Sequence, residues 1–292
     1  AATAGAAGVN LGEVVSWARR LLAGAGVAEA PLEAEVLLCH ALGLGRAQLY
    51  ARLRELLPPG ALRRLLCLVG RRMSRQPLPY ILGRREFYGL ELVVTPAAMI
   101  PRQETELLVE LALEWLASHP GPRLVVDVGT GCGAIALAVA RHAQEEVRVV
   151  ATEVSPPALA LAWHNAHRLG LAGRVQMVLA DLLSPLRGPI DLVVANLPYV
   201  PTADLASAPP ELRWEPRVAL DGGPDGLRLV ARLLSQLPSR LAPGGAALLE
   251  LAPQQVDKAM TLARRHLPTA RLHLHHDLAG LPRALFLHLP IY

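Results

Sequence analysis

The second part of this 292-residue chain alternates between two sequence patterns, and this alternation constrains the fold more than any other feature. Short apolar runs predict strands at residues 123–128, 147–152, 174–180, 190–195, 245–251, 270–276 and 284–289. Patterns of helical period lie between most of them, at 134–143, 156–168, 225–240 and 253–265. Strands separated by helices predict an α/β fold with a seven-stranded, mostly parallel sheet covered on both faces. Such sheets bind ligands beyond the carboxyl ends of their strands.

The first hundred residues are organised differently. Apolar residues at helical spacing predict helices at 11–22, 31–38, 49–57 and 62–69, with no strand pattern among them. Proline and glycine are frequent in residues 77–102, where 86–94 has a strand-like composition around a turn at Gly89. A further helix is expected at 104–117. We therefore expect a helical bundle at 1–76, a β-hairpin linker at 77–102 and an α/β domain at 103–292.

Composition narrows the class of protein. A hydrophobic content of 52% excludes disorder for most of the chain, and no apolar run approaches the ~20 residues of a membrane-spanning helix. The first ten residues lack the basic start and apolar block of a signal peptide. Cys39, Cys67 and Cys132 have no close-paired spacing, which argues against disulfides and zinc. We expect a cytoplasmic protein that holds no metal.

A glycine-rich loop follows the first predicted strand of the α/β domain and leads into a helix. It reads Asp127-Val128-Gly129-Thr130-Gly131-Cys132-Gly133. Glycines let the backbone turn sharply and let a ligand approach its N–H groups. The spacing fits the relaxed dinucleotide fingerprint, but Asp127 and Gly133 complete the D-x-G-x-G-x-G form usual in S-adenosylmethionine-dependent methyltransferases. Asp127, two residues before the first glycine, is expected to bind the cofactor, where it could meet a cationic or polar group.

Two acidic residues end the next two strands. Glu153 follows the glycine loop at the distance expected of an acid that binds both hydroxyls of a ribose, although it could instead cap the following helix. Asp181 could accept a hydrogen bond from an adenine amino group, with Leu182 packed on the ring. An ordinary loop aspartate explains Asp181 nearly as well.

The segment Asn196-Leu197-Pro198-Tyr199 after the fourth strand is the most informative in the chain. The Asn196 side-chain oxygen and a carbonyl in the turn can each accept one hydrogen of an –NH2 group. Tyr199 offers a flat face to a planar amide or base. Fixing both hydrogens would direct a weakly nucleophilic nitrogen toward an electrophilic methyl group, mainly through positioning. An Asx-type turn alone would not explain its combination with the glycine loop and the acids.

Residues 77–292 resemble the protein-(glutamine-N5) methyltransferases that modify peptide chain release factors, the HemK/PrmC family. The resemblance lies in separate segments: Pro77 to Gly83, Glu86 to Gly89, Ile100 to Glu106, Asp127 to Ile135, Asn196 to Tyr199, Trp214 to Pro216, Ala219 to Gly226 and Pro243 to Gly245. The Ile-Pro-Arg…Glu-Thr-Glu and Glu-Pro…Gly-Gly-x-Asp-Gly blocks are far more specific than the glycine loop. The helices before residue 77 match the family in architecture only.

This resemblance implies a Rossmann-like S-adenosylmethionine-dependent methyltransferase fold and a role for each motif. Residues 129–133 would hold the cofactor, Glu153 its ribose and the Asp181-Leu182 region its adenine, with Phe87 and Arg102 near the cofactor mouth. Asn196 and the Pro198 carbonyl would hold the glutamine of the Gly-Gly-Gln loop of class I release factors. The front helices, where residues 1–100 carry 12 arginines and 7 glutamates, would recognise the release factor. We expect a monomer with no direct nucleic-acid binding.

One departure from the family keeps an alternative open. The family usually has Asn-Pro-Pro-Tyr, whereas Asn196-Leu197-Pro198-Tyr199 is the form typical of ribosomal RNA adenine dimethyltransferases. An RNA N6-adenine methyltransferase is therefore the second hypothesis, although those enzymes lack the Ile-Pro-Arg…Glu-Thr-Glu block. A non-catalytic nucleoside-binding module and an NAD oxidoreductase are weaker alternatives.

Other chemistry-bearing residues have simpler interpretations. His273, His275, His276 and Asp277 suggest a metal cluster, but the strand period turns His276 away from the first two. His164 and His167 fit a solvated helix face, and Cys132 fits a small residue in a tight turn. No Gly-x-Ser-x-Gly motif is present to support serine hydrolase chemistry.

Overall fold

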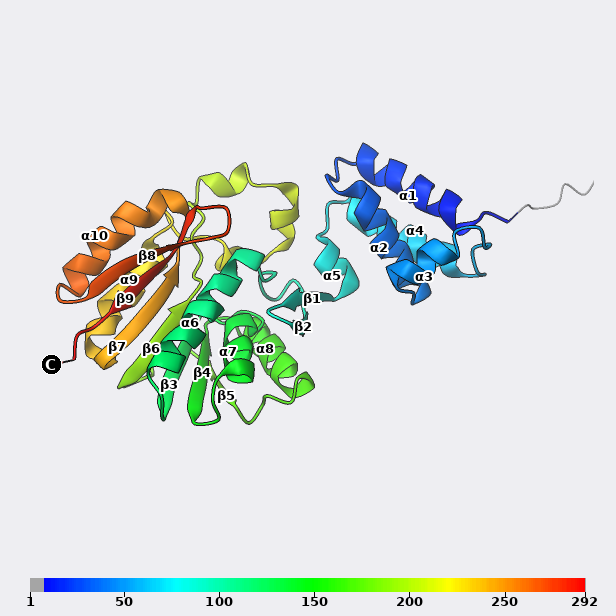
Figure 1. Ribbon diagram of the computed structural model, residues 1–292. Coiled ribbons are helices and arrows are strands. Elements are labelled where there is room, and N and C mark those ends of the chain that lie inside the picture. Colours follow the sequence, from blue (N-terminus) through cyan, green and yellow to red (C-terminus); the bar gives the residue numbers. More distant parts are fainter. Residues whose placement is uncertain (1–7, 292) are drawn as a thin grey trace, which may run out of the picture. The chain divides into compact units, whose positions relative to one another are not determined.

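A computed structural model describes residues 8–291 and divides the chain into two compact units. The first unit ends at Gly83 and the second begins at Arg84 (Figure 1). The expected linker at 77–102 is therefore divided between them. Its first residues form α5 (Leu78–Leu82) of the first unit, and its hairpin belongs to the second.

The first unit is helical, as its apolar spacing predicts. It contains α1 (Leu11–Gly24), α2 (Ala30–Leu42), α3 (Arg46–Ala51) and α4 (Ala61–Met73) before α5. Asn10 caps α1, because its Oδ1 accepts from the Glu13 N–H while Glu13 accepts from the Asn10 N–H, both at 2.9 Å. Apolar faces of α1, α2 and α4 meet in a core of their own.

The expected helix at 49–57 is wrong, since α3 ends at Ala51. The backbone at residues 53–57 is instead hydrogen-bonded to residues 9–12, with Leu11 N–H donating to the Glu55 carbonyl at 3.0 Å and Leu57 N–H to the Val9 carbonyl at 2.9 Å. This pairing with a distant segment outweighs the local helical pattern.

The second unit begins with the hairpin of β1 (Arg84–Phe87) and β2 (Leu90–Val93). Tyr88 and Gly89 both have positive φ, 48° and 72°, as a two-residue type I′ turn requires. The buried Asn165 amide ties this hairpin to the glycine loop. It accepts from the Val93 N–H at 2.8 Å and donates to the Val93 and Cys132 carbonyls at 3.0 and 2.9 Å.

A seven-stranded sheet forms the body of the second unit, in the order β5-β4-β3-β6-β7-β9-β8. Its strands are β3 (Arg123–Val128), β4 (Val147–Glu153), β5 (Val175–Leu179), β6 (Ile190–Ala195), β7 (Leu241–Glu250), β8 (Arg271–His276) and β9 (Pro282–His288). The first five strands in that order are parallel, and β9 runs antiparallel to both of its neighbours. The predicted mostly parallel, seven-stranded sheet is confirmed.

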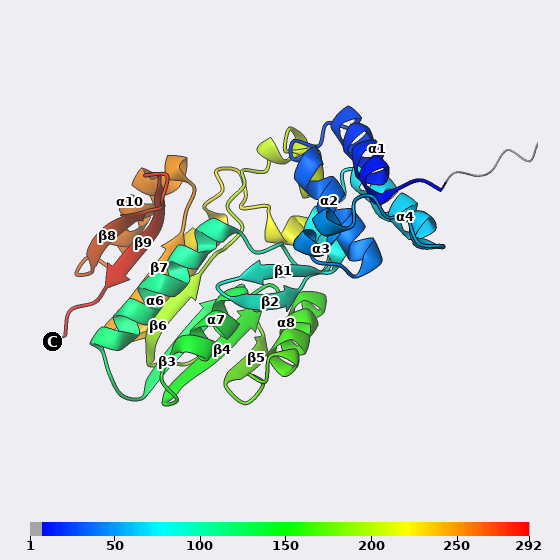
Figure 2. The same cartoon turned by 45° about the vertical axis from the view of Figure 1, so that its right-hand side comes forward.

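Helices cover both faces of this sheet (Figures 1 and 2). They are α6 (Glu106–Ser118), α7 (Ala134–His142) and α8 (Pro156–Arg168) on one face, and α9 (Arg228–Gln236) and α10 (Val256–His266) on the other. The helix expected at 225–240 is shorter at both ends. Gly226 has φ +76°, outside the helical region, and keeps the preceding residues in a loop.

The parallel strands place their carboxyl ends along one edge of the sheet. The glycine loop follows β3 there, Glu153 ends β4, Asn196 follows β6 and Glu250 ends β7. These side chains come from distant parts of the chain, and the topology alone brings them together.

Candidate active site

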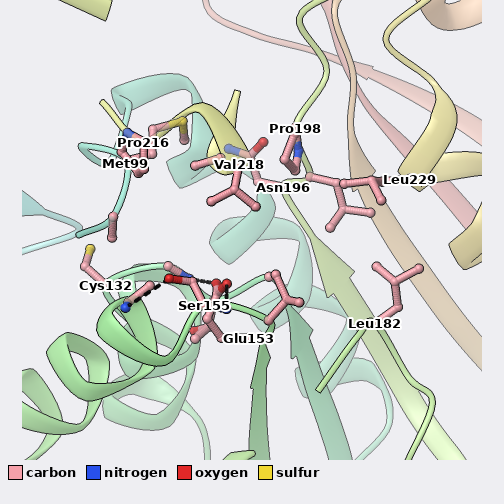
Figure 3. A pocket seen from close by; sticks show the side chains of 18 of the residues that line it. Met99, Cys132, Glu153, Ser155, Leu182, Asn196, Pro198, Pro216, Val218 and Leu229 are labelled. Carbon is pink, nitrogen blue, oxygen red and sulfur yellow. Dashed lines mark hydrogen bonds between the residues drawn. The ribbon is translucent and has the colours of Figure 1, made fainter. Parts of the chain in front are cut away.

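A cavity of about 540 Å³ lies at the carboxyl edge of the sheet (Figure 3). Its volume falls within the range of small-molecule sites. Its walls come from the ends of β3, β4 and β6, the turn after β5, and residues 97–105 and 216–232. Leu182 and Leu229 line one end, and Met99 and Pro216 line the other (Figure 3).

The glycine loop forms the floor of this cavity. The N–H groups of Gly129 and Thr130 donate to the Thr152 carbonyl at 2.9 and 3.0 Å, so the loop folds back on β4. Gly129, Thr130, Gly131 and Cys132 line the cavity. Gly133 does not line it. Gly133 has φ +91° and precedes α7, where an added Cβ would lie 2.9 Å from Leu137.

Asp127 lies beneath the loop and is absent from the cavity lining. Its Oδ2 accepts from the Thr130 hydroxyl at 2.6 Å and from the Ala136 N–H at 3.1 Å. Burial raises the pKa of this carboxyl to about 7, against the lowering effect of those hydrogen bonds. Its contacts therefore shape the loop, and its contact with a cofactor stays a prediction.

Glu153 lines the cavity at the end of β4, where it is 8% exposed. Its Oε2 accepts from the Gly131 N–H and its Oε1 from the Ser155 N–H, each at 2.9 Å (Figure 3). Each carboxylate oxygen can accept more than one hydrogen bond, so both retain acceptor capacity. This arrangement suits two neighbouring hydroxyl groups.

The end of the cavity beyond β5 combines an apolar surface with a carboxylate. Leu182 has φ +55°, a conformation that is costly outside glycine and is concentrated at functional sites. Asp181 lines the cavity and is paired with Arg232 at 2.6 Å, with both side chains about half exposed. A planar ring could lie against Leu182 and Leu229 with its polar edge near Asp181.

Asn196 brings an unused hydrogen-bond acceptor to the cavity wall. Its Nδ2 donates to Thr105 Oγ1 at 3.0 Å, and its buried Oδ1 has no hydrogen-bond partner within residues 8–291. Leu197 and Pro198 also line the cavity, and the Leu197 side chain lies over Gly129. Tyr199 does not line it, and burial raises the pKa of its phenol.

The comparisons with known proteins match both units. Residues 13–83 match the family described as the PrmC N-terminal domain, and residues 95–208 match the methyltransferase small domain. The release factor glutamine methyltransferase of Moorella thermoacetica is 49% identical over 255 residues, covering 87% of this chain and 88% of that protein. This chain belongs to the release factor glutamine methyltransferase family.

Further relatives agree with that placement. The release factor glutamine methyltransferase of Geobacter sulfurreducens is 45% identical and covers 87% of this chain and 88% of its own. Among solved structures, the hMettl16 catalytic domain in complex with an RNA hairpin has a TM-score of 0.57 at 18% identity, covering 77% of this chain and 82% of its own. A methyltransferase from Pyrococcus furiosus has a TM-score of 0.52 at 15% identity and covers 79% of this chain and all of its own. These two structures support the fold alone.

Contacts with Glu215 join residues 100–102 to the segment after β6, beside the cavity. The Arg102 guanidinium pairs with Glu215, whose other oxygen accepts from the Ile100 N–H at 3.2 Å. Neither Phe87 nor Arg102 lines the cavity, although the resemblance places both near its mouth. Phe87, at the end of β1, is buried. Arg102 instead contacts Glu215, the residue before Pro216.

Sequence reasoning missed three residues that hold the Asn196 turn and its surroundings. Thr105 and Glu215 lie within the motif blocks, but nothing in those blocks reveals their partners. Gln255 carries no sequence signal, yet its Nε2 donates to the Tyr199 carbonyl at 2.7 Å and to the Asp225 carbonyl at 3.2 Å.

Other chemistries find little support in the part of the chain that the structure describes. No group of three or more histidine, cysteine, aspartate or glutamate side chains in residues 8–291 is arranged to hold a metal ion. Burial raises the pKa of the Cys132 thiol to about 12, which keeps it protonated and unreactive. No helix in these residues has the length and apolar character needed to cross a bilayer.

Proposed function

We propose that this chain transfers the methyl group of S-adenosylmethionine to the side-chain amide nitrogen of the glutamine in the Gly-Gly-Gln motif of class I release factors. The observation that carries the proposal is the Asn196 Oδ1 atom, a buried acceptor on the cavity wall of a family member whose relatives are named release factor glutamine methyltransferases. A primary amide has two hydrogens to donate, and Asn196 Oδ1 has the capacity to accept one of them.

The residues present fit the proposed cofactor. The backbone of Gly129 and Gly131 approaches the cavity closely, and an added Cβ at Gly129 would lie 3.1 Å from Leu197. Glu153 would accept from the two ribose hydroxyls, and Leu182 would pack on the adenine with Asp181 near its amino group. The cofactor supplies an electrophilic methyl group on a positively charged sulfur.

The chain's own part in the reaction is positioning. Asn196 Oδ1 and the Pro198 carbonyl would accept the two amide hydrogens, which directs the nitrogen toward the methyl group. Asn196 cannot act as a base, and transfer needs none, because the extra proton can leave the nitrogen afterwards. Methyl transfer would move the positive charge from the sulfur to the nitrogen, and the departing proton would then remove it. The mostly apolar wall would exclude water from this step.

The first unit is the part of the chain that we expect to bind the release factor. Residues 13–83 match the PrmC N-terminal domain and carry an excess of arginine. We assign this unit to release-factor recognition, and we place the reaction in the cytoplasm, where translation terminates. Adenine methylation of RNA is the second candidate, favoured only by Leu197 in the Asn-Leu-Pro-Tyr turn.

Mass spectrometry of a purified release factor tests the proposal. Incubation with this protein and S-adenosylmethionine should add one methyl group to the Gly-Gly-Gln tryptic peptide, on the glutamine, while protein-free ribosomal RNA gains none. Asn196→Ala should bind the cofactor normally in calorimetry and lose turnover. His164→Ala, an exposed change on α8, is the matched control and should behave as the wild type. A methylated RNA with an unmodified release factor would overturn the proposal.

A further inference from the structure

An asparagine can serve as an acceptor only if its amide faces the right way. The oxygen and the nitrogen of the group have nearly the same size, so packing alone does not choose between them. With Oδ1 toward the cavity, Asn196 accepts from a substrate –NH2 group. With Nδ2 toward the cavity, this donor would face the substrate –NH2 group, which is also a donor, and no hydrogen bond would form. The proposed function therefore requires a neighbour that selects one orientation.

Thr105 is that neighbour. It lines the cavity from the turn that precedes α6, is 4% exposed, and its Oγ1 receives the Asn196 Nδ2–H at 3.0 Å. The opposite end of the amide, Oδ1, is left as the end without a partner among the described side chains. Figure 3 shows Asn196 beside Pro198 on the cavity wall.

A threonine hydroxyl could in principle donate to Oδ1 as easily as it accepts from Nδ2. In the structure the contact is made by Nδ2, which lies 3.0 Å from Thr105 Oγ1, while Oδ1 has no partner within residues 8–291. The hydroxyl is therefore the acceptor of this hydrogen bond, and the Asn196 amide is held with Nδ2 toward Thr105.

We propose that Thr105, whose Oγ1 accepts from Asn196 Nδ2, is a positioning residue that fixes the Asn196 amide with Oδ1 toward the substrate. The inference rests on the proposed function, because it explains how the acceptor of that reaction is oriented. Thr105 does not touch the reacting atoms in this account.

Replacing the hydroxyl with a methyl group tests the inference. Thr105→Val keeps the shape of the side chain and removes its acceptor, so the Asn196 amide can rotate. Turnover on a release factor should fall at least tenfold, while the cofactor Kd stays within twofold of the wild type. Thr105→Ser restores the hydroxyl and should recover turnover to within threefold. Unchanged turnover in Thr105→Val, or a cofactor Kd that rises in step with the loss, would overturn the inference.

A second measurement does not depend on activity. The side-chain amide signals of Asn196 can be assigned in ¹⁵N-labelled protein by their loss in Asn196→Asp. Their hydrogen exchange should be slow in the wild type and in Thr105→Ser, and at least tenfold faster in Thr105→Val. Equal exchange in all three would overturn the positioning role. A wild-type protein that shows slow exchange but never methylates a release factor would instead contradict the proposed function alone.

Discussion

Glu153 is the side chain that joins the glycine loop to the end of β4. Its two oxygens accept from the Gly131 and Ser155 N–H groups, and the residue lines the cavity. Glu153→Gln replaces one of these acceptors with a donor, which would face a backbone N–H or a ribose hydroxyl. A mismatched hydrogen bond to a charged group costs about 1.5–3 kcal/mol, so S-adenosylmethionine affinity should fall by roughly ten- to a hundredfold.

Calorimetric titration of Glu153→Gln with the cofactor measures this change directly. Asp191→Asn is a suitable control, because Asp191 is also an acceptor for a backbone N–H, that of Leu124 at 2.8 Å, but does not line the cavity. The control should bind the cofactor as the wild type does. Equal cofactor affinity in Glu153→Gln and the wild type would show that Glu153 only caps the following turn.

The raised pKa of Glu250 predicts how the stability of the protein depends on pH. Burial raises its pKa from 4.5 to about 7 in the folded protein, opposed by the Thr105 hydrogen bond and by Arg283 and Arg102, and assisted by Glu104. The folded state holds this proton more tightly than the unfolded state does. Its contribution to stability is therefore complete below pH 4.5 and is lost as the pH rises toward 7.

Glu250→Gln removes this titration and should flatten the decline. Between pH 5 and 8 the free energy of unfolding of the wild type should fall relative to that of Glu250→Gln, by an amount on the order of 3 kcal/mol. Asp127, whose pKa is also raised to about 7 by burial, contributes a similar decline to both proteins. Urea unfolding at several pH values gives the comparison, and parallel curves for the two proteins would contradict the buried, protonated state of Glu250.

At the level of single residues, the sequence predicted those side chains whose position follows from a strand end. Glu153 and Asn196 line the cavity because the carboxyl ends of parallel strands meet there. Asp127 and Arg102 belong to the motifs, but neither lines the cavity; they hold neighbouring backbone or side chains, and their part in cofactor binding stays a prediction. A motif identifies which residues belong to a site, but it does not reveal which side of a loop each one faces.

At the level of elements, the segment between β6 and α9 depends on buried contacts more than on regular structure. The Glu215 side chain is 1% exposed and holds both Arg102 and the Ile100 N–H. Glu215→Ala should leave the buried Ile100 N–H without a partner and release Arg102, which is 34% exposed, and should destabilise the protein by about 1–3 kcal/mol. Residues 200–227 should then exchange backbone hydrogens faster, as measured by mass spectrometry.

The Arg217–Asp221 pair is the matched control for this prediction. It lies in the same segment, but the Arg217 side chain is 72% exposed. Arg217→Ala should cost less than about 1 kcal/mol, as is usual for exposed pairs. If the two variants unfold at the same denaturant concentration, the Arg102–Glu215 clasp does not stabilise this segment.

The same segment shows where elements could not be predicted. The strands and most helices of the sheet follow from local periodicity, and they appear where the sequence places them. Residues 196–227 have no period, and their path depends on close approaches between glycines and carbonyl groups. An added Cβ at Gly222 would lie 2.6 Å from the Pro198 oxygen, and one at Gly226 would lie 2.2 Å from the Tyr199 oxygen. Such long-range contacts leave no local pattern.

At the level of the whole molecule, each unit contains its own hydrophobic core. Leu22, Leu37 and Leu65 belong to the core of the first unit, whereas Val193 and Leu248 are buried in the sheet of the second. The proposed cofactor and amide-binding residues all lie after Gly83. A protein comprising residues 84–292 should therefore fold, and should bind S-adenosylmethionine with a Kd within threefold of the full chain.

Loss of the first unit should affect only the recognition of the large substrate. The shortened protein should methylate a short Gly-Gly-Gln peptide as fast as the full chain does, because the proposed chemistry is confined to the second unit. On an intact release factor its KM should rise at least tenfold with little change in kcat, since a lost docking surface removes binding energy that is equal in the ground and transition states. Steady-state kinetics on both substrates separates the two effects. A shortened protein that retains the full chain's KM for the release factor would mean that the arginine-rich helices serve another purpose.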